Sequence, residues 1–357
     1  MKTKLYRNRI VALLLISVLT FVIAACGKSE DKGTSESTKP ASSSSSATEE
    51  SSKPKEEVTI NIGVQGKTGI LPYARSKGLF EKALAKDNIK VTWNEFASGP
   101  PHFEAIAAGR IDFGSVGGTP VISGQVGDVG FKAVAVTSDG RKGNMIIVPK
   151  DSPIKELKDL KGKKVGVAKG SSAYNFLYMA IDKAGLTGDD VKVIQLQPDE
   201  ARPALDSGAI DAWSIWEPYA TVAEHQTGAT VLVSGEDLNI NAPGFLIART
   251  KFLDQHPDAA VAFLKAYEEV RLYYSTHIDE VAGDLADAAK LEKEVLAEVM
   301  HRTEPLLSPI TPEFAKAHQE QADFLFKVGA INKQLDTSKV LDSKYVEQAL
   351  AELKEGK

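Results

Sequence analysis

Residues 105–112 read AIAAGRID, and residues 204–211, which lie 99 positions later, read ALDSGAID. A second pair of similar stretches precedes them in the same order, because IGVQG at 62–66 is echoed by VGVAKG at 165–170. Each unit runs strand, glycine loop, helix, strand, then a helix that ends in Gly-x-Ile-Asp before another strand. The spacing is too long for a solenoid repeat. The two echoes therefore predict two similar α/β lobes with a cleft between them.

The sequence around these echoes alternates between strand and helix patterns. The alternation begins with the strand pattern at 58–64 and continues to about residue 248, which predicts an α/β fold with largely parallel sheets. Beyond residue 251 the pattern changes to amphipathic runs. We expect these runs to form helices, at 258–274, 312–328 and 343–353.

Composition limits the class of protein. The chain has 357 residues, of which 43% are hydrophobic and 25% charged, and these values are typical of a soluble globular protein. Its formal net charge of -5 argues against a nucleic-acid binder, which usually carries a basic excess. We therefore expect no nucleic-acid partner.

The first 25 residues have the pattern of a secretory signal peptide. Four positive residues lie among the first nine, and an almost wholly apolar run follows over 10–25. That run has the size of a signal h-region and is short for a membrane span of roughly 20 residues. It ends in IAAC at 23–26, which resembles the lipobox of bacterial lipoproteins. We expect cleavage before Cys26, the only cysteine in the chain, and lipid attachment to its thiol.

The residues after Cys26 are mostly Ser, Thr, Lys, Glu and Pro, so they predict a disordered tether that holds the folded part near the membrane. The whole chain then divides into five expected parts. These are the signal peptide (1–25), the lipidated cysteine and tether (26–57), the first part of lobe 1 (58–148), lobe 2 (149–245), and a return to lobe 1 with C-terminal helices (246–357).

The candidate binding site follows from the places where strands end and helices begin. In open α/β sheets, ligands bind beyond the carboxyl ends of the strands, beside helix N-termini whose unpaired N–H groups attract anions. Glycine, serine and threonine gather at such junctions in both predicted lobes. Any one junction could be an ordinary helix cap, but their repetition predicts a cleft for a small anion. The five junctions are residues 65–68, 98–100, 117–119, 170–172 and 216–218.

Other chemistries fit the sequence less well. GVQGKT at 63–68 has two residues between its glycines, whereas a nucleotide-binding P-loop needs four. The six histidines include no pair at metal-ligand spacing, so we expect no metal and no cofactor. His102 lies near the predicted site, and we expect it to be a structural or surface residue. An enzyme on this fold and an adhesive surface lipoprotein remain as alternatives, and a receptor is the favoured interpretation.

Five stretches together resemble the signature segments of aliphatic sulfonate-binding proteins, relatives of the taurine- and nitrate-type receptors of ABC importers. They are SGPP at 98–101, IDFGSVG at 111–117, LKDLKGKKV at 157–165, KGSS at 169–172 and DAWSIWEPY at 211–219. The resemblance covers about residues 58–257. It implies a two-lobed periplasmic-binding-protein fold of type II, with crossovers near 146–149 and 245–249.

The resemblance also implies partners and a location. The protein would be a monomer without enzymatic activity that passes a small anion, a sulfonate, to the permease subunits of an ABC importer. The lipid on Cys26 would hold it on the extracytoplasmic face of the cell membrane, and the long tether suits a Gram-positive surface. Receptors for taurine, nitrate or bicarbonate remain alternatives on the same fold.

Under this resemblance the sulfonate oxygens accept bonds from backbone N–H groups and hydroxyls of five residues: Gly99, Gly118, Thr119, Ser171 and Ser172. Gln65 closes one side. Trp216 packs against the apolar part of the ligand, unless it belongs to the core with Trp213. Glu217 either points to a basic partner or holds the ammonium group of an amino-sulfonate. We expect Arg202 to be a solvated helix residue and not a charge partner of the ligand.

Overall fold

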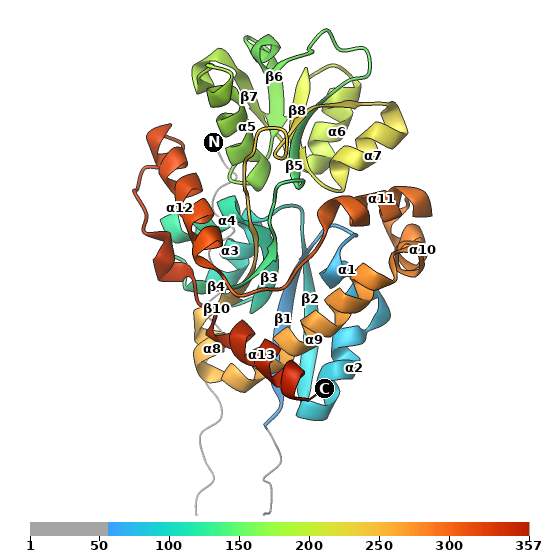
Figure 1. The fold of residues 1–357 in the computed structure, drawn as a ribbon, viewed down its shortest axis with the longest axis vertical. Coiled ribbons are helices and arrows are strands. Elements are labelled where there is room, and N and C mark those ends of the chain that lie inside the picture. The colour runs from blue at the N-terminus through green and yellow to red at the C-terminus, as the bar shows by residue number, and fades with distance from the viewer. Residues whose placement is uncertain (1–55, 357) are drawn as a thin grey trace, which may run out of the picture. The chain divides into compact units, whose positions relative to one another are not determined.

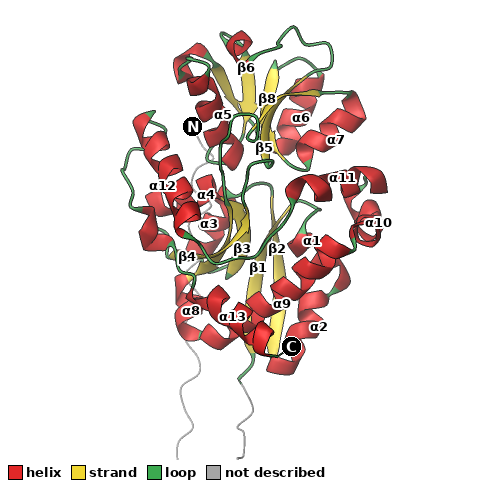
Figure 2. Ribbon diagram, viewed as in Figure 1, coloured by secondary structure: helices red, strands yellow, loops and turns green. Residues whose placement is uncertain are grey.

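The computed structural model describes residues 56–356, and the fold is drawn in Figure 1. The predicted signal peptide, Cys26 and all but the last two residues of the predicted tether lie outside the described residues. Within 56–356, no helix combines the length and apolar character needed to span a membrane. The described chain forms two lobes, each built around a five-stranded sheet with helices on its faces (Figure 2).

The sheet of lobe 1 contains four mutually parallel strands and one antiparallel strand, which occupies the fourth position in space. Its buried residues alternate with more exposed ones along the first strand, as the sequence pattern predicts. In spatial order the strands are β2 (Ile89–Phe96), β1 (Val58–Gln65), β3 (Phe113–Gly117), β10 (Gly244–Arg249) and β4 (Phe131–Ser138).

The sheet of lobe 2 repeats this order with a second set of strands. Again the fourth strand in space is antiparallel to both of its neighbours. The prediction of an α/β protein with two similar lobes, in the periplasmic-binding fold of type II, is therefore confirmed. In spatial order the strands are β7 (Lys192–Gln195), β6 (Lys164–Val167), β8 (Ala212–Trp216), β5 (Asn144–Val148) and β9 (Thr230–Ser234).

The antiparallel strand of each sheet is the one that arrives from the other lobe. The first crossover, residues 139–143, leads from β4 to β5, and the second, residues 235–243, leads from β9 to β10. The sequence places both crossovers several residues too late, at 146–149 and 245–249. Those residues are apolar strand residues that belong to the receiving sheets, and an apolar strand pattern does not reveal which sheet it joins.

The echoed Gly-x-Ile-Asp segments perform the same task in both lobes. The Asp112 carboxylate accepts a bond from the Asn61 N–H at 2.9 Å, and the Asp211 carboxylate accepts one from the Lys164 N–H at 2.8 Å. Each aspartate thus links the start of one strand to its parallel neighbour: β3 to β1 in lobe 1, and β8 to β6 in lobe 2. The preceding glycines, at 109 and 208, both adopt a left-handed conformation that ends the helix before them.

Helices cover both sheets. Lobe 2 carries α5 (Ser172–Lys183), α6 (Pro198–Asp206) and α7 (Tyr219–Thr227). Lobe 1 carries α1 (Ile70–Lys77), α2 (Leu79–Leu84), α3 (Pro100–Ala107) and α4 (Gly118–Val126) from the first part of the chain. From the returning part it carries α8 (Thr250–Gln255), α9 (Pro257–Thr276), α10 (Ile278–Ala289), α11 (Lys293–Thr303), α12 (Pro312–Lys327) and α13 (Lys344–Glu355).

The returning helices supply much of the core of lobe 1, because α9 and α13 pack with α1, α2 and the sheet into one apolar cluster. The predicted helical runs at 258–274, 312–328 and 343–353 correspond to α9, α12 and α13. Two elements of this part also reach lobe 2. Helix α11 contacts α7, and α12 lies beside both α4 and α5 (Figure 1).

Candidate functional site

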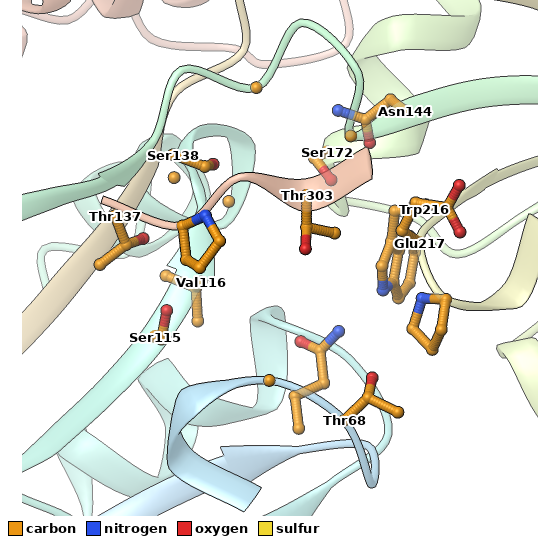
Figure 3. Close-up of a pocket in the computed structure, with 18 of the residues that line it drawn as sticks. Thr68, Ser115, Val116, Thr137, Ser138, Asn144, Ser172, Trp216, Glu217 and Thr303 are labelled. Carbon is orange, nitrogen blue, oxygen red and sulfur yellow. The ribbon is translucent and has the colours of Figure 1, made fainter. Parts of the chain in front are cut away.

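A cleft with a volume of about 490 Å³ lies between the two lobes. Both lobes and the first crossover contribute to its lining, and so does the segment that follows α11. Figure 3 shows Thr68 and Ser115 on the side of lobe 1, Ser172 and Trp216 on the side of lobe 2, and Thr303 between them. Six of the residues predicted from the sequence line it, namely Gln65, Gly99, Ser171, Ser172, Trp216 and Glu217.

Five helices begin at a residue of this lining or directly after one: α1, α5 and α7 in the first case, and α3 and α4 in the second. The first turn of a helix has N–H groups without intrahelical partners, and it carries a partial positive charge. Helix α3 is limited in this respect, since Pro100 and Pro101 have no N–H group and leave Gly99 as the donor. Helix α5 keeps the N–H of Ser172, while the Ser171 hydroxyl accepts the Tyr174 N–H at 3.2 Å and caps the helix.

Glycines just before the N-termini of α4 and α5 let the two lobes approach each other closely. A Cβ atom added to Gly117 of lobe 1 would lie 2.9 Å from the Ser172 Cβ of lobe 2. Gly170 is left-handed, with φ of 74°, and a Cβ there would lie 3.2 Å from the Ser123 hydroxyl and 3.4 Å from Pro100. Two positive helix ends therefore meet from opposite lobes, and an anion between them would relieve their repulsion.

Two predicted residues, Gly118 and Thr119, are not among the residues that line the cleft. A Cβ on Gly118 would lie 3.2 Å from His318 Nδ1 and 3.3 Å from Gln321 Oε1, so α12 packs directly against this glycine. Thr119 is only 2% exposed, and its hydroxyl has no partner within residues 56–356. The sequence correctly indicates a helix start here, but it does not reveal that α12 covers it.

Several polar residues of the cleft were not predicted from the sequence. The hydroxyl side chains among them come from strands β3 and β4 and from the end of α11. Asn144, at the start of β5, is 3% exposed, and its Oδ1 has no partner in the described chain. The local patterns of these residues are those of ordinary strand and helix positions, which is why they gave no signal. The hydroxyl residues are Ser115, Thr137, Ser138 and Thr303, whereas Thr68, which also lines the cleft, lies within the predicted junction at 65–68.

Every basic side chain of the lining has a carboxylate partner. Lys142 Nζ lies 3.1 Å from the Glu304 carboxylate, and Arg141 Nε lies 3.6 Å from that of Asp139. The third basic residue, Arg302, is paired with Glu217 at 3.3 Å. The hydroxyl and backbone N–H groups of the described lining are therefore the donors whose charge is not already balanced by a carboxylate.

Glu217 points to a basic partner, which is the first of the two alternatives considered for it. Its carboxylate accepts bonds from the Thr221 hydroxyl at 2.9 Å and the Thr221 N–H at 3.3 Å, in addition to the Arg302 contact. Burial raises the pKa of Glu217, and the bonds from Thr221 and Arg302 oppose that shift. Arg202 pairs with Asp206 on its own helix, at 3.0 Å, and does not line the cleft.

Arg302 is the centre of a larger ionic contact between the lobes. From α11 it donates to Glu217 and, at 2.6 Å, to Glu224 of α7, and it also pairs with Glu298 of its own helix. Glu298 in turn accepts from His225 of α7 at 2.8 Å. We call this group the ionic contact.

Trp216 is both a wall of the cleft and a part of the core. Its ring meets that of Tyr219 edge-on at 5.8 Å, and it packs against both apolar clusters of lobe 2. Trp213, three residues earlier, is 1% exposed and belongs to the core alone. Because an odd number of residues separates them along β8, the two side chains point to opposite faces of the sheet.

His102 is a structural residue, as expected. Its ring is fully buried under the sheet of lobe 1, where a Cβ on Gly63 or on Gly114 would lie 2.7 Å from it. Nδ1 lies 3.2 Å from the Ser98 carbonyl oxygen, and burial lowers the pKa of His102 to about 4. Within the described chain, no group of three or more His, Cys, Asp or Glu residues could hold a metal ion.

Two lobes of this strand order, joined by two crossovers around one cleft, define the protein as a periplasmic-binding protein of type II. The chain belongs to the NMT1/THI5-like family, whose sequence model matches residues 67–279. It is 42% identical to a protein of Bacillus subtilis over 96% of this chain and 98% of that protein. It is 34% identical to a protein of Escherichia coli over 78% of this chain and 86% of that one. Both relatives carry the name "Putative aliphatic sulfonates-binding protein".

Solved structures show the same fold. The alkanesulfonate-binding protein SsuA of Xanthomonas axonopodis pv. citri, bound to MOPS, superimposes with a TM-score of 0.75 at 26% identity, over 80% of this chain and 98% of that one. The aliphatic sulphonate-binding protein SsuA of Escherichia coli gives 0.70 at 31% identity, over 81% of this chain and 92% of that one. The desulfurization enzyme DSZB also has this fold, with a TM-score of 0.62 at 18% identity over 83% of this chain and 99% of that one.

Proposed function

We propose that this protein captures a small organic anion, an aliphatic sulfonate, and delivers it to the permease subunits of an ABC importer. The observation that carries the proposal is the cleft itself, where five helices begin while each basic side chain is already paired with a carboxylate. Sulfonate oxygens are acceptors only, so they match N–H and hydroxyl donors such as those of Gly99 and Ser172. Trp216 supplies an apolar wall for the organic part.

The choice of a sulfonate among small anions is supported by the names of the relatives and of the solved structures with the same fold. The residues themselves support a small anion more broadly. Receptors for taurine, nitrate or bicarbonate are therefore the alternatives that an experiment must separate. Gly118 and Thr119 remain in the proposed site only as the buried support of the α4 N-terminus, and Gln65 as a side wall.

The same proposal covers export and anchoring. The chain is exported, cleaved before Cys26 and lipidated there, and the tether up to residue 57 holds the folded part as a monomer on the extracytoplasmic side of the membrane. The basic n-region, the apolar run and the IAAC sequence support this. Mass spectrometry of the membrane-extracted protein should find a lipid-modified Cys26 as its first residue. A Cys26→Ser variant should be released from the membrane, and an unchanged distribution of that variant would contradict the anchor.

The proposed protein is a receptor and not an enzyme. Within the described chain, the lining of the cleft contains no histidine and no cysteine, the side chains that most often act as base and nucleophile. An enzyme would convert its ligand, whereas a receptor binds it and releases it unchanged.

Isothermal titration tests the proposed ligand class. The soluble part, residues 53–357, is titrated with a panel of short alkanesulfonates, taurine, nitrate and bicarbonate. We expect one-to-one binding to an alkanesulfonate, and mass spectrometry should recover that ligand intact. Heat with nitrate or bicarbonate alone would assign the cleft to an inorganic anion, and no heat with any compound would refute the proposal.

A further inference from the structure

The side chain of Gln321 connects three parts of the molecule at the back of the cleft. It projects from α12 of lobe 1 and is 2% exposed. Its Nε2 donates to the carbonyl oxygen of Asn241, in the second crossover, at 2.7 Å. Its Oε1 accepts from Nδ2 of Asn175, on α5 of lobe 2, at 3.4 Å. One amide group therefore spans from the crossover to the other lobe, and we call these three residues the amide contact.

The partner helix of Gln321 is the one that brings the binding groups of lobe 2 to the cleft. Asn175 lies about one turn beyond Ser172, and the two residues belong to the same rigid helix. The position of Asn175 therefore fixes the distance between Ser172 and Gly117 across the cleft. Further along both helices, Lys327 of α12 lies 3.8 Å from Asp182 of α5, but that pair is exposed and contributes little.

The amide contact is costly to bury. The Oδ1 atoms of Asn175 and Asn241 have no partner in the described chain, and the same holds for both ring nitrogens of His318 beside them. Apolar side chains would fill this space at a lower cost if stability alone mattered. Directional hydrogen bonds, in contrast, hold their partners at one distance and one angle.

We propose that Gln321 is a positioning residue for ligand capture, which holds α5 against the second crossover so that its N-terminus faces the N-termini of α3 and α4. This inference rests on the proposed function. In the closed protein the ligand bonds to both lobes, and it leaves when they separate. Loosening the amide contact therefore raises the dissociation rate of the ligand and leaves the rate at which the ligand enters the open cleft unchanged.

The test replaces Gln321 by Met, which keeps its length and volume but not its hydrogen bonds. The kinetics of the alkanesulfonate that binds in the titration are followed by tryptophan fluorescence, because Trp216 lines the cleft. Loss of the one neutral hydrogen bond that joins Gln321 to lobe 2 predicts a dissociation rate about 3- to 10-fold higher, with the association rate changed less than twofold. Asn175→Leu should have a similar effect, and the double variant should add little to either, since both break one contact.

The matched control is Gln319→Met, on the same helix. Gln319 bonds to Asp323, to the Leu335 carbonyl oxygen and to Thr337, all within lobe 1. This variant should lose at least as much stability to urea as Gln321→Met does, and its dissociation rate should stay at the wild-type value. Gln321→Ala is a second variant for the same test, in case the methionine side chain stabilises the contact by packing.

Three results would overturn the proposal. They are an unchanged dissociation rate in both Gln321 variants, an equal rise in Gln319→Met, and additive effects in the double variant. If the wild-type protein binds none of the compounds, the proposed function fails and this inference falls with it. If it binds a sulfonate and the Gln321 variants release it at the wild-type rate, the proposed function stands and only this inference fails.

Discussion

The two contacts that join the lobes beside the cleft are built from different chemical groups. The amide contact is neutral, and its Gln321 and Asn175 side chains are almost fully buried, while Arg302, which pairs with three glutamates in the ionic contact, has about a third of its side chain exposed. Hydrogen bonds between neutral amides depend strongly on geometry, and ion pairs act over longer distances. The comparison indicates that the amide contact sets the angle between the lobes and that the ionic contact tolerates changes in that angle.

Removing the cation from the ionic contact should have the largest effect. Arg302→Ala leaves the Glu217 carboxylate, whose side chain is 1% exposed, without a positive partner. Breaking one partner of a buried pair predicts a loss of about 3 kcal/mol in the free energy of unfolding, measured by urea denaturation.

Arg141→Ala is the control for Arg302→Ala, because Arg141 and Asp139 are both about half exposed and such a pair contributes at most about 1 kcal/mol. Adding Glu217→Gln to Arg302→Ala should recover part of the loss, since it removes the unpaired charge. Equal stability of the two alanine variants would show that the ionic contact is no stronger than a surface pair.

Acid should disturb the amide contact through His318. Burial lowers the pKa of His318 from 6.5 to about 4. Between pH 6.5 and pH 4, His318 is therefore protonated in the unfolded chain but not in the folded protein. Stability therefore falls as the pH drops through 6.5 and toward 4. By pH 5 the loss from this one residue should be about 2 kcal/mol, from the linkage relation.

The variant His318→Leu has no group to titrate at this position. Its unfolding free energy should fall less steeply between pH 6.5 and pH 5 than that of the wild type, by the same 2 kcal/mol in order of magnitude, although His102 still titrates in both proteins. Parallel pH profiles for the two proteins would place the acid-sensitive group elsewhere.

Two hydroxyl groups at neighbouring helix starts give the smallest effect and the finest distinction. Ser172 lines the cleft, while Thr119 lies behind the lining. Ser172→Ala removes a donor to the ligand, which predicts an affinity about 3- to 10-fold weaker in a titration. Thr119→Val keeps the shape of the side chain and should leave the affinity unchanged. If Thr119→Val weakened binding and Ser172→Ala did not, Thr119 would contact the ligand, as the sequence alone predicts.

The sequence predicts the fold well because the determining signals are local. The strand alternation, the helix-ending glycines and the repeated Gly-x-Ile-Asp are each readable within a few residues, and their repetition indicates two lobes. The same holds for Gly99, Ser171 and Ser172, which stand at strand exits and line the cleft.

The contacts between the lobes that the sequence missed are made by the returning part of the chain. Arg302 meets Glu217 across 85 positions, and Gln321 meets Asn175 across 146. No local pattern indicates such contacts, because they depend on how α11 and α12 pack after the core has formed. Helix α12 covers Gly118 for the same reason. Gly118 and Thr119, which the sequence alone places on the surface of the cleft, therefore lie behind its lining.

A crystal structure of the protein with butanesulfonate would test the central claim most directly. The account predicts one sulfonate group between the lobes, with its oxygens within hydrogen-bond distance of the Ser172 N–H and of Gly99, and its butyl chain against Trp216. Gln321 should contact both Asn175 and Asn241 in that complex. A ligand bound outside this cleft, or held by a basic side chain released from its carboxylate partner, would contradict the account.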